Sequence, residues 1–305
     1  MKILITGCAG FIGSNLTDYL LKKGYEVIGI DCLTNYYSKK LKETNIINAF
    51  DNDNFNFIEK DILEMEKFPE VDYIYHMAAQ AGVRTSWGKN FQTYTKNNIE
   101  ATQKLLEFYK NQNIKKFIYS SSSSVYGDVK VPMNEECLLK PISPYGVSKL
   151  AAENLCYLYW KNFNIPIISL RYFTVYGPRQ RPDMAINKFV RSILNDEEIV
   201  IYGDGNQSRD FTYIDDVLDA LILSAESDVK GEVFNVGGGS RISINDLIKE
   251  IEKISKCNAV ISHSTKQNGD VKDTFADLTK INKYLNWKPK ISIQEGLNKY
   301  ISSIN

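Results

Sequence analysis

The stretch Lys2-Ile-Leu-Ile-Thr-Gly-Cys-Ala-Gly-Phe-Ile-Gly13, with the residues that follow it as far as Asp31, decides the fold. Lys2 to Thr6 is a short apolar run, typical of a buried strand. A turn with three glycines follows, and Ser14 to Lys23 then carries apolar residues at helical spacing. Glu26 to Ile30 is a second short apolar run. The order of strand, glycine turn, helix and strand predicts the first unit of a parallel sheet.

The glycine turn and Asp31 together predict a dinucleotide site. Glycines at 7, 10 and 13 would let backbone N–H groups approach a pyrophosphate at a helix N-terminus, although a tight structural turn would also explain them. Their spacing is G-x-x-G-x-x-G, in place of the G-x-G-x-x-G of many dehydrogenases. Asp31 ends the second strand, where a carboxylate binds both ribose hydroxyls of NAD and repels the 2′-phosphate of NADP. The sequence therefore favours NAD.

Composition describes an ordinary globular protein. Of the 305 residues, 43% are hydrophobic, and Lys+Arg and Asp+Glu both number 37, so the formal net charge is zero. This balance gives no reason to expect a nucleic-acid or membrane partner. The two histidines lie far apart, so we expect no metal site. Five scattered cysteines without a C-x-x-C pair, and the absence of a signal-like or membrane-spanning run, predict a cytoplasmic protein.

The alternation of predicted strands and helices continues to about residue 170. Further strands are expected at Phe57 to Ile62, Val71 to His76, Phe117 to Ser124 and Ile165 to Tyr172. Beyond that point the pattern becomes irregular, and Glu232 to Val236 would return the chain to the sheet. We therefore predict an α/β fold, a Rossmann doubly wound parallel sheet with a smaller, intertwined C-terminal substrate-binding domain. Residues 1–170, rejoined by about 211–237, would form the first domain, and residues 171–305 the second.

Tyr145 and Lys149 are the candidate catalytic pair. They lie four residues apart after Pro144, so in a helix that opens there both side chains project from one face. An ammonium close to a tyrosine favours the phenolate and lowers its pKa from about 10 toward the working range. A hydroxyl from the serine run, Ser122, could bind the same substrate oxygen while hydride leaves for a nicotinamide. A Tyr and a Lys at this spacing also occur by chance on exposed helices.

With Ser122, Tyr145 and Lys149 in place, the whole chain resembles the extended branch of the short-chain dehydrogenases/reductases, the nucleotide-sugar epimerases and dehydratases. The resemblance implies NAD as the cofactor and a homodimer formed through the helices at Phe91 to Asn111 and after Tyr145. The cofactor contacts expected are Gly7, Gly10, Phe11, Ile12, Gly13, Asp31, Asn35, Asp61, Ile62, Ala78, Ala79, Gln80, Asn98, Ser120, Ser121, Tyr145, Lys149 and Phe173.

The residues after the first serines indicate the reaction. Dehydratases of this branch carry Asp and Glu where this chain has Ser123 and Ser124, and UDP-glucuronate decarboxylases usually keep a Glu at the second position. The remaining set suffices for an epimerase, which oxidises C4 of the sugar and returns the hydride to the opposite face. Decarboxylation, dehydration and a non-catalytic NAD-sensing regulator remain the alternatives, and the intact catalytic set argues against the last of them.

Several segments resemble UDP-glucuronate 4-epimerases, among them Asn35-Tyr36-Tyr37, Ala79 to Arg84 and Thr174 to Pro178. UDP-glucose is the second candidate substrate, since Arg179-Gln180 is also found in UDP-glucose epimerases and Asn268 replaces a usual proline. The keto acid formed from glucuronate loses carbon dioxide readily, and Thr174 and Arg181 could restrain its carboxylate. The expected substrate contacts, with Arg209 on the diphosphate, are Arg84, Ser122, Ser123, Thr174, Arg181, Asn187, Lys188, Tyr202, Arg209 and Asp270.

Overall fold

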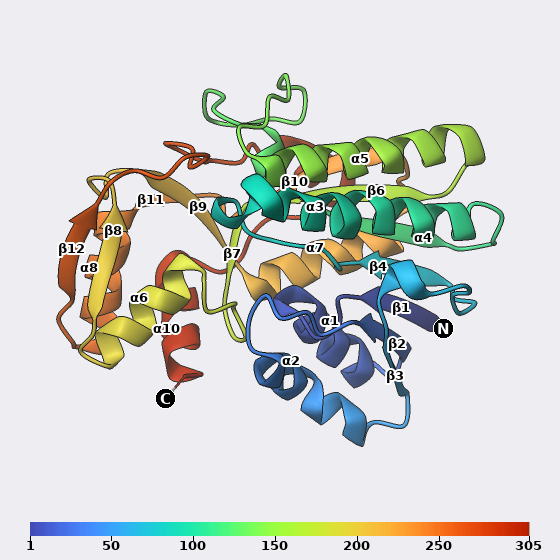
Figure 1. Ribbon diagram of the computed structural model, residues 1–305, viewed down its shortest axis with the longest axis horizontal. Coiled ribbons are helices and arrows are strands. Elements are labelled where there is room, and N and C mark those ends of the chain that lie inside the picture. Colours follow the sequence, from blue (N-terminus) through green and yellow to red (C-terminus); the bar gives the residue numbers. More distant parts are fainter. Residues whose placement is uncertain (305) are drawn as a thin grey trace.

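A seven-stranded parallel sheet forms the centre of the protein in a computed structural model that describes residues 1–304 (Figure 1). The strand order β10-β6-β5-β4-β1-β2-β3 is doubly wound, so the expected fold class is confirmed. The strands are β1 (Lys2–Thr6), β2 (Glu26–Asp31), β3 (Phe55–Glu59), β4 (Tyr73–His76), β5 (Lys116–Ser122), β6 (Ile167–Tyr172) and β10 (Glu232–Val236). All residues of β6 and all but the first of β1 are buried, and most of them are apolar, as is typical of central parallel strands.

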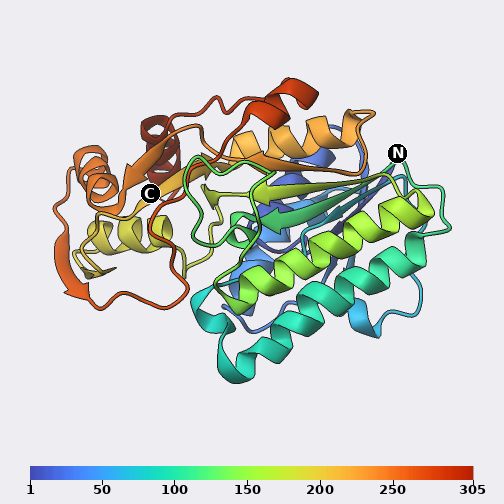
Figure 2. The same ribbon diagram turned by 90° about the horizontal axis from the view of Figure 1, so that it is seen from above.

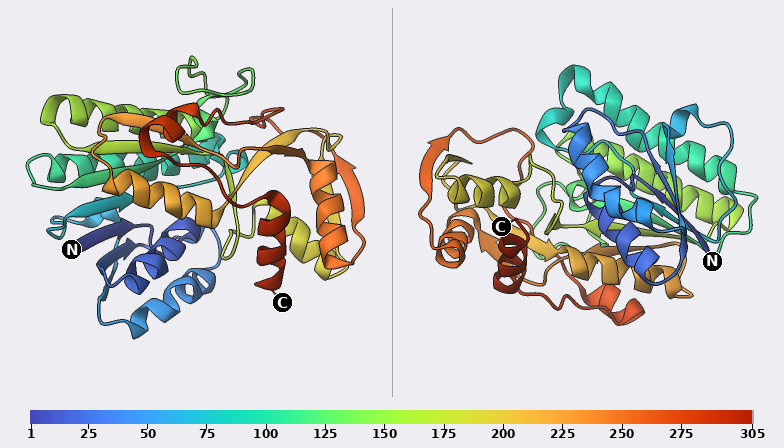
Figure 3. Two further views of the ribbon diagram at one scale, coloured as in Figure 1. Left: turned by 180° about the vertical axis from the view of Figure 1, so that it is seen from behind. Right: turned by 90° about the horizontal axis from the view of Figure 1, so that it is seen from below.

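Helices cover both faces of this sheet. One face carries α1 (Phe11–Lys22), α2 (Lys39–Ile46) and α7 (Ile214–Glu226), and Figure 3 shows α7 beside α1. The other face carries α3 (Phe91–Tyr94), α4 (Ala101–Tyr109) and α5 (Pro144–Phe163), of which α4 and α5 run side by side in Figure 2. Ser143 caps α5 by accepting a hydrogen bond from the Gly146 N–H at 3.1 Å. The cap fixes where the catalytic helix begins.

A smaller lobe lies at one end of the sheet, around two short sheets (Figure 1). The first contains β7 (Thr174–Tyr176), β9 (Ser208–Tyr213) and β11 (Arg241–Ser243), and the second contains β8 (Glu198–Tyr202) and β12 (Val260–Ser264). The helices of this lobe are α6 (Ala185–Leu194), α8 (Ile244–Ser255) and α10 (Ile293–Ser302), while α9 (Thr279–Leu285) packs on β10. The short helical turns are η1 (Ile47–Asp51), η2 (Ile62–Glu64), η3 (Arg84–Ser86), η4 (Gly88–Asn90) and η6 (Ser123–Val125).

The two lobes share one hydrophobic core. Ile5 of the central sheet belongs to the same cluster of buried side chains as Trp287 and Leu297 of the C-terminal region. The Trp287 indole N–H also donates to the backbone carbonyl of Asp216 in α7 at 3.1 Å. A shared core is what an intertwined arrangement of two domains requires. We propose that the division lies at about residue 170 and that residues of about 211–237 return to the first domain. Within residues 1–304, no helix is long and apolar enough to cross a membrane.

Some local features differ from the expectations in detail. The helix expected over Phe91 to Asn111 is present from α3 to the end of α4, with a π-helical segment, η5 (Thr95–Glu100), inside it. The third strand lies at Phe55–Glu59 and ends before Ile62. Neither the short helix α2 nor the edge strand β12 was predicted, because α2 has little apolar periodicity and β12 is largely exposed. Strongly apolar segments were predicted best because burial dominates their pattern.

Candidate active site

A cleft opens at the carboxyl ends of β1 and β4, where the connections leave the sheet in opposite directions. Many predicted cofactor contacts line it together: Gly7, Gly10, Phe11, Ile12, Gly13, Asp31, Asp61, Ile62, Ala78, Ala79, Gln80, Ser120, Ser121, Tyr145 and Lys149. Arg181, predicted as a substrate contact, lines the same cleft. Residues that the sequence pattern did not single out as contacts also line it, among them Tyr37, Lys42, Asn97 and Tyr172.

The glycine turn has no space for side chains. A Cβ on Gly13 would lie 2.1 Å from the Gly7 carbonyl oxygen, and a Cβ on Gly7 would lie 2.7 Å from the Ala78 nitrogen. Gly7 also has a φ of +71°, which favours glycine. Gly10 caps α1 without any side-chain hydrogen bond to its first turn. The bare helix N-terminus, open to the cleft, suits a pyrophosphate group.

Asp31 is held rigidly at the far side of this turn. Its carboxylate accepts hydrogen bonds from the backbone N–H groups of Ala9 at 3.0 Å and Leu33 at 2.9 Å. Burial raises the pKa of Asp31, and these bonds and the nearby Lys42 oppose the rise. Lys42 donates to the Thr34 carbonyl at 2.6 Å, and its ammonium lies 4.7 Å from the centre of the Tyr37 ring. The residues at this end fit the adenosine ribose of a dinucleotide.

The predicted catalytic residues lie at the end of β5 and on α5. Burial raises the pKa of Tyr145, and a hydrogen bond with Ser122 and the charge of Arg181 oppose that rise. Lys149 is 2% exposed, and burial lowers its pKa to about 8. Its ammonium lies 4.6 Å from the centre of the Tyr119 ring. In the protein chain alone, Arg181 is the cation that lowers the pKa of Tyr145, and the action of Lys149 on the tyrosine stays a prediction.

A buried ion pair between Glu153 and Arg171 lies next to these catalytic residues. Glu153, one turn of α5 beyond Lys149, accepts a hydrogen bond from the Ser121 hydroxyl at 2.5 Å. The Arg171 guanidinium on β6 donates to both oxygens of Glu153, with its shortest contact at 2.6 Å, and to the Tyr126 hydroxyl at 2.9 Å. The pair ties β5, α5 and β6 together directly beneath the cleft. Its position could not be inferred from sequence, because the partners belong to different elements.

Asn98 supports the cleft through Gln80, and its contact with the cofactor stays a prediction. It accepts a hydrogen bond from the Gln80 N–H at 2.7 Å and donates to the Gln80 carbonyl at 3.0 Å and to Ser148 at 2.8 Å. The preceding residue in the π-helical segment, Asn97, lines the cleft instead. Asn35 is exposed outside the cleft lining, and Phe173 is buried against Tyr126. The contacts of Asn35 and Phe173 with the cofactor stay predictions.

The remaining predicted substrate contacts, Ser122 among them, are outside the residues that line the cleft. Arg84 pairs with Asp270 at 2.7 Å and lies 4.3 Å from the Tyr202 ring centre, so these three predicted residues do meet. Arg209 donates to the backbone carbonyls of Ser208, Lys272 and Val271 at 2.8 to 2.9 Å.

The other predicted substrate residues are less directly placed. The Asn187 amide is occupied within the protein, since it donates to the Gln180 carbonyl at 2.6 Å and accepts from Arg191 at 2.9 Å. Its contact with the nucleotide stays a prediction. Thr174 and Ser123 are half-buried and Lys188 is exposed.

Comparison with known proteins agrees with this geometry. The sequence profile described as GDP-mannose 4,6 dehydratase matches residues 4–300. The UDP-glucuronate 4-epimerase of Thermodesulfobacterium geofontis is 40% identical, with 98% of this chain and 94% of the relative covered. The Bacillus cereus UDP-glucuronic acid 4-epimerase, crystallised with UDP-glucuronic acid and NAD, superposes with a TM-score of 0.96 at 46% identity, with all of both chains covered.

A structure of a UDP-glucose 4-epimerase from Thermotoga maritima with UDP-glucose is also similar. It superposes with a TM-score of 0.91 at 35% identity and covers 100% of this chain and 98% of that one. Fold, cleft and sequence profile therefore agree over nearly the whole length of the protein. The chain belongs to the extended short-chain dehydrogenase/reductase family of nucleotide-sugar epimerases and dehydratases.

Proposed function

We propose that this protein is an NAD-dependent 4-epimerase of UDP-sugars, and that it converts UDP-glucuronate to UDP-galacturonate. The observation that carries the proposal is the cleft that Tyr145 and Lys149 line together with a glycine turn that fits a pyrophosphate, with Ser122 in hydrogen-bond contact with Tyr145. Ser123 and Ser124 supply no carboxylate for an elimination. The Bacillus cereus enzyme bound to NAD and UDP-glucuronic acid supports both the cofactor and the substrate.

The residues divide the reaction between them. NAD, held by the glycine turn and Asp31, would supply the acceptor for the hydride of C4 and the donor for its return to the opposite face of the sugar. Tyr145 takes the proton of the C4 hydroxyl and returns it after the 4-keto sugar has rotated to present its other face. Ser122 holds the same oxygen through its hydroxyl. Lys149, buried and charged at neutral pH, would favour the phenolate once a ligand draws its ammonium from the Tyr119 ring.

The substrate preference rests on a small number of cations. Arg181 lies at the cleft with Tyr145, so it can hold a carboxylate on C5 of the sugar. Thr174, half-buried at the start of β7, supplies a hydroxyl for the same group. Arg84, which pairs with Asp270, and Arg209, whose guanidinium also donates to three backbone carbonyls, are the further cations that suit the diphosphate. A UDP-glucose epimerase has no need of a cation at the C5 substituent.

We also propose a homodimer. Tyr157 and Leu158 of α5 are 56% and 48% exposed, and Val147 and Phe163 on the same helix are also exposed. Apolar side chains gathered on one helix suit a second copy of the chain. Light scattering coupled to gel filtration would give the mass, and a monomer at micromolar concentration would contradict the proposal. The cytoplasmic location stays a prediction.

The test of function is direct. The purified protein is incubated with NAD and with UDP-glucuronate, UDP-glucose or UDP-N-acetylglucosamine, each alone, and products are separated by chromatography with mass detection. We expect UDP-galacturonate at unchanged mass. UDP-galactose as the only product would retain the chemistry and reject the substrate. Loss of carbon dioxide or water as the main outcome would reject the epimerase.

A further inference from the structure

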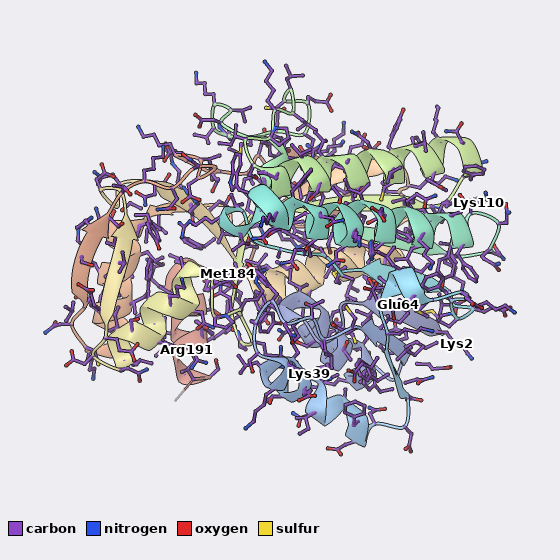
Figure 4. The ribbon with its side chains drawn as sticks, viewed as in Figure 1. Lys2, Lys39, Glu64, Lys110, Met184 and Arg191 are labelled. Carbon is purple, nitrogen blue, oxygen red and sulfur yellow. The ribbon has the colours of Figure 1, made fainter. Side chains whose placement is uncertain are left out.

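Two loops from different lobes meet over the cleft. One follows β2 and carries Tyr36, and the other joins β7 to α6 and carries Asp183. The Tyr36 hydroxyl donates to a carboxylate oxygen of Asp183 at 3.2 Å, although 147 residues separate them in sequence. Figure 4 labels Met184, the next residue, at the end of α6 nearest the central sheet. The contact therefore links the part of the protein built on the central sheet to the smaller lobe.

The same carboxylate holds Arg181 at two points. Arg181 donates from Nε to Oδ1 of Asp183 at 2.9 Å and from Nη2 to Oδ2 at 3.0 Å. The guanidinium also lies 5.7 Å from the centre of the Tyr36 ring. Within residues 1–304, Nη1 makes no hydrogen bond, while the side chain lines the cleft and is 21% exposed. A two-point ion pair fixes the plane of a guanidinium and leaves its free end for a ligand.

The Tyr36 hydroxyl is itself held by contacts with neighbouring hydroxyl groups. Its hydroxyl lies 3.5 Å from that of Thr85, which is 2.7 Å from the Tyr94 hydroxyl. Tyr94 donates to the backbone carbonyl of Gly82 at 2.8 Å, and its ring meets that of Tyr145 edge-on at 6.1 Å. A Cβ on Gly82 would lie 2.3 Å from the Tyr36 hydroxyl, so this glycine leaves room for the contact. Contacts between the hydroxyls of Tyr36, Thr85 and Tyr94, and the ring contact of Tyr94 with Tyr145, thus link Asp183 to the catalytic tyrosine.

We propose that Asp183 and Tyr36 are positioning residues that fix the Arg181 guanidinium across the two lobes, so that its free Nη1 holds the sugar carboxylate. The inference rests on the proposed function and deepens it. Oxidation at C4 creates a keto acid that decays when the C5–C6 bond stands perpendicular to the carbonyl plane. The bond's electron pair then forms an enolate, carbon dioxide leaves and C5 takes a proton. A rigid guanidinium resists the rotation that this step needs.

The experiment measures how much of the 4-keto intermediate loses carbon dioxide and how much is reduced to UDP-galacturonate. Asp183→Asn, Tyr36→Phe and wild type are incubated with NAD and UDP-glucuronate, and the ratio of decarboxylated UDP-sugar to UDP-galacturonate is measured by mass. We expect the ratio to rise at least several-fold in Asp183→Asn and to a smaller extent in Tyr36→Phe, which keeps the ion pair. This ratio does not depend on the folded fraction, so a merely structural loss of stability would leave it unchanged.

Two controls make the result specific. Tyr284→Phe, on an exposed ring of α9, should leave the ratio at the wild-type value. Arg181→Gln should set the upper limit, and adding Asp183→Asn to it should raise the ratio no further. Wild-type ratios in both Asp183→Asn and Tyr36→Phe would overturn this inference while leaving the proposed function intact. A wild-type protein that forms no UDP-galacturonate would overturn both.

Discussion

Replacing the catalytic lysine should make the protein more stable. Lys149 is nearly inaccessible, and burial lowers its pKa from the ordinary 10.5 to about 8. At neutral pH the buried side chain is charged, and the pKa difference corresponds to a cost of about 3 kcal/mol. The contact of its ammonium with the Tyr119 ring, at 4.6 Å, offsets about 1–2 kcal/mol of that. Lys149→Met should therefore gain about 1–2 kcal/mol at about pH 7.

The dependence on pH separates this cause from simple packing. Below pH 8 the lysine is charged in both the folded and the unfolded chain, so its full cost is present. Between about 8 and 10.5 the unfolded chain binds more protons at this site, and wild-type stability gains relative to the variant as pH rises. The advantage of Lys149→Met should therefore shrink steadily between these values. The same variant should lose most epimerase activity at neutral pH and retain its remainder at alkaline pH.

Urea unfolding of the protein stripped of cofactor, at about pH 7 and about pH 10, provides the assay. Lys161→Met, an exposed lysine of the same helix, is the matched control and should change the free energy of unfolding by less than about 0.5 kcal/mol. A Lys149→Met protein less stable than wild type at neutral pH would refute the reasoning. A stability difference that does not vary with pH would refute it as well.

Three further changes test other parts of the site. Tyr145→Phe should lower kcat by a factor of at least about 10² without lowering the thermal midpoint, and turnover near the wild-type rate would rule out the tyrosine as the base. Asp31→Ala should narrow the preference for NAD over NADP, because Lys42 then faces the 2′-phosphate without a competing carboxylate. Binding titrations with NAD and with NADP would measure the ratio of the two affinities. An unchanged ratio would show that another residue selects the cofactor. Glu153→Gln leaves the buried Arg171 charge without its partner and should cost about 3–5 kcal/mol in urea unfolding, whereas a loss below about 1 kcal/mol would contradict the role of the pair.

The sequence predicted the sheet well because its strands depend on local pattern. Lys2–Thr6 and Glu232–Val236 were predicted at the bounds found in the structure, since buried parallel strands are nearly continuous apolar runs. Tyr145 and Lys149 share a helix, so their spacing alone places them together. The glycine turn needs no distant partner to be recognised either.

The remainder of the site depends on contacts between distant segments. Tyr36 meets Asp183 and Glu153 meets Arg171 only because the sheet and the small lobe assemble around the cleft. No local periodicity records such pairs. The π-helical segment places Asn97 among the residues that line the cleft and leaves Asn98 outside them. The sequence did not predict this segment, because its apolar spacing is that of an ordinary helix.

The central claim is that hydride leaves C4 and returns to it within one active site. UDP-glucuronate carrying deuterium at C4 is converted in ordinary water with bound NAD, and the mass of UDP-galacturonate is measured at early times. The account predicts that the product keeps its deuterium, because the hydride passes to the cofactor and back without meeting solvent. Loss of the deuterium to water would contradict it, since that result requires removal of the hydrogen as a proton.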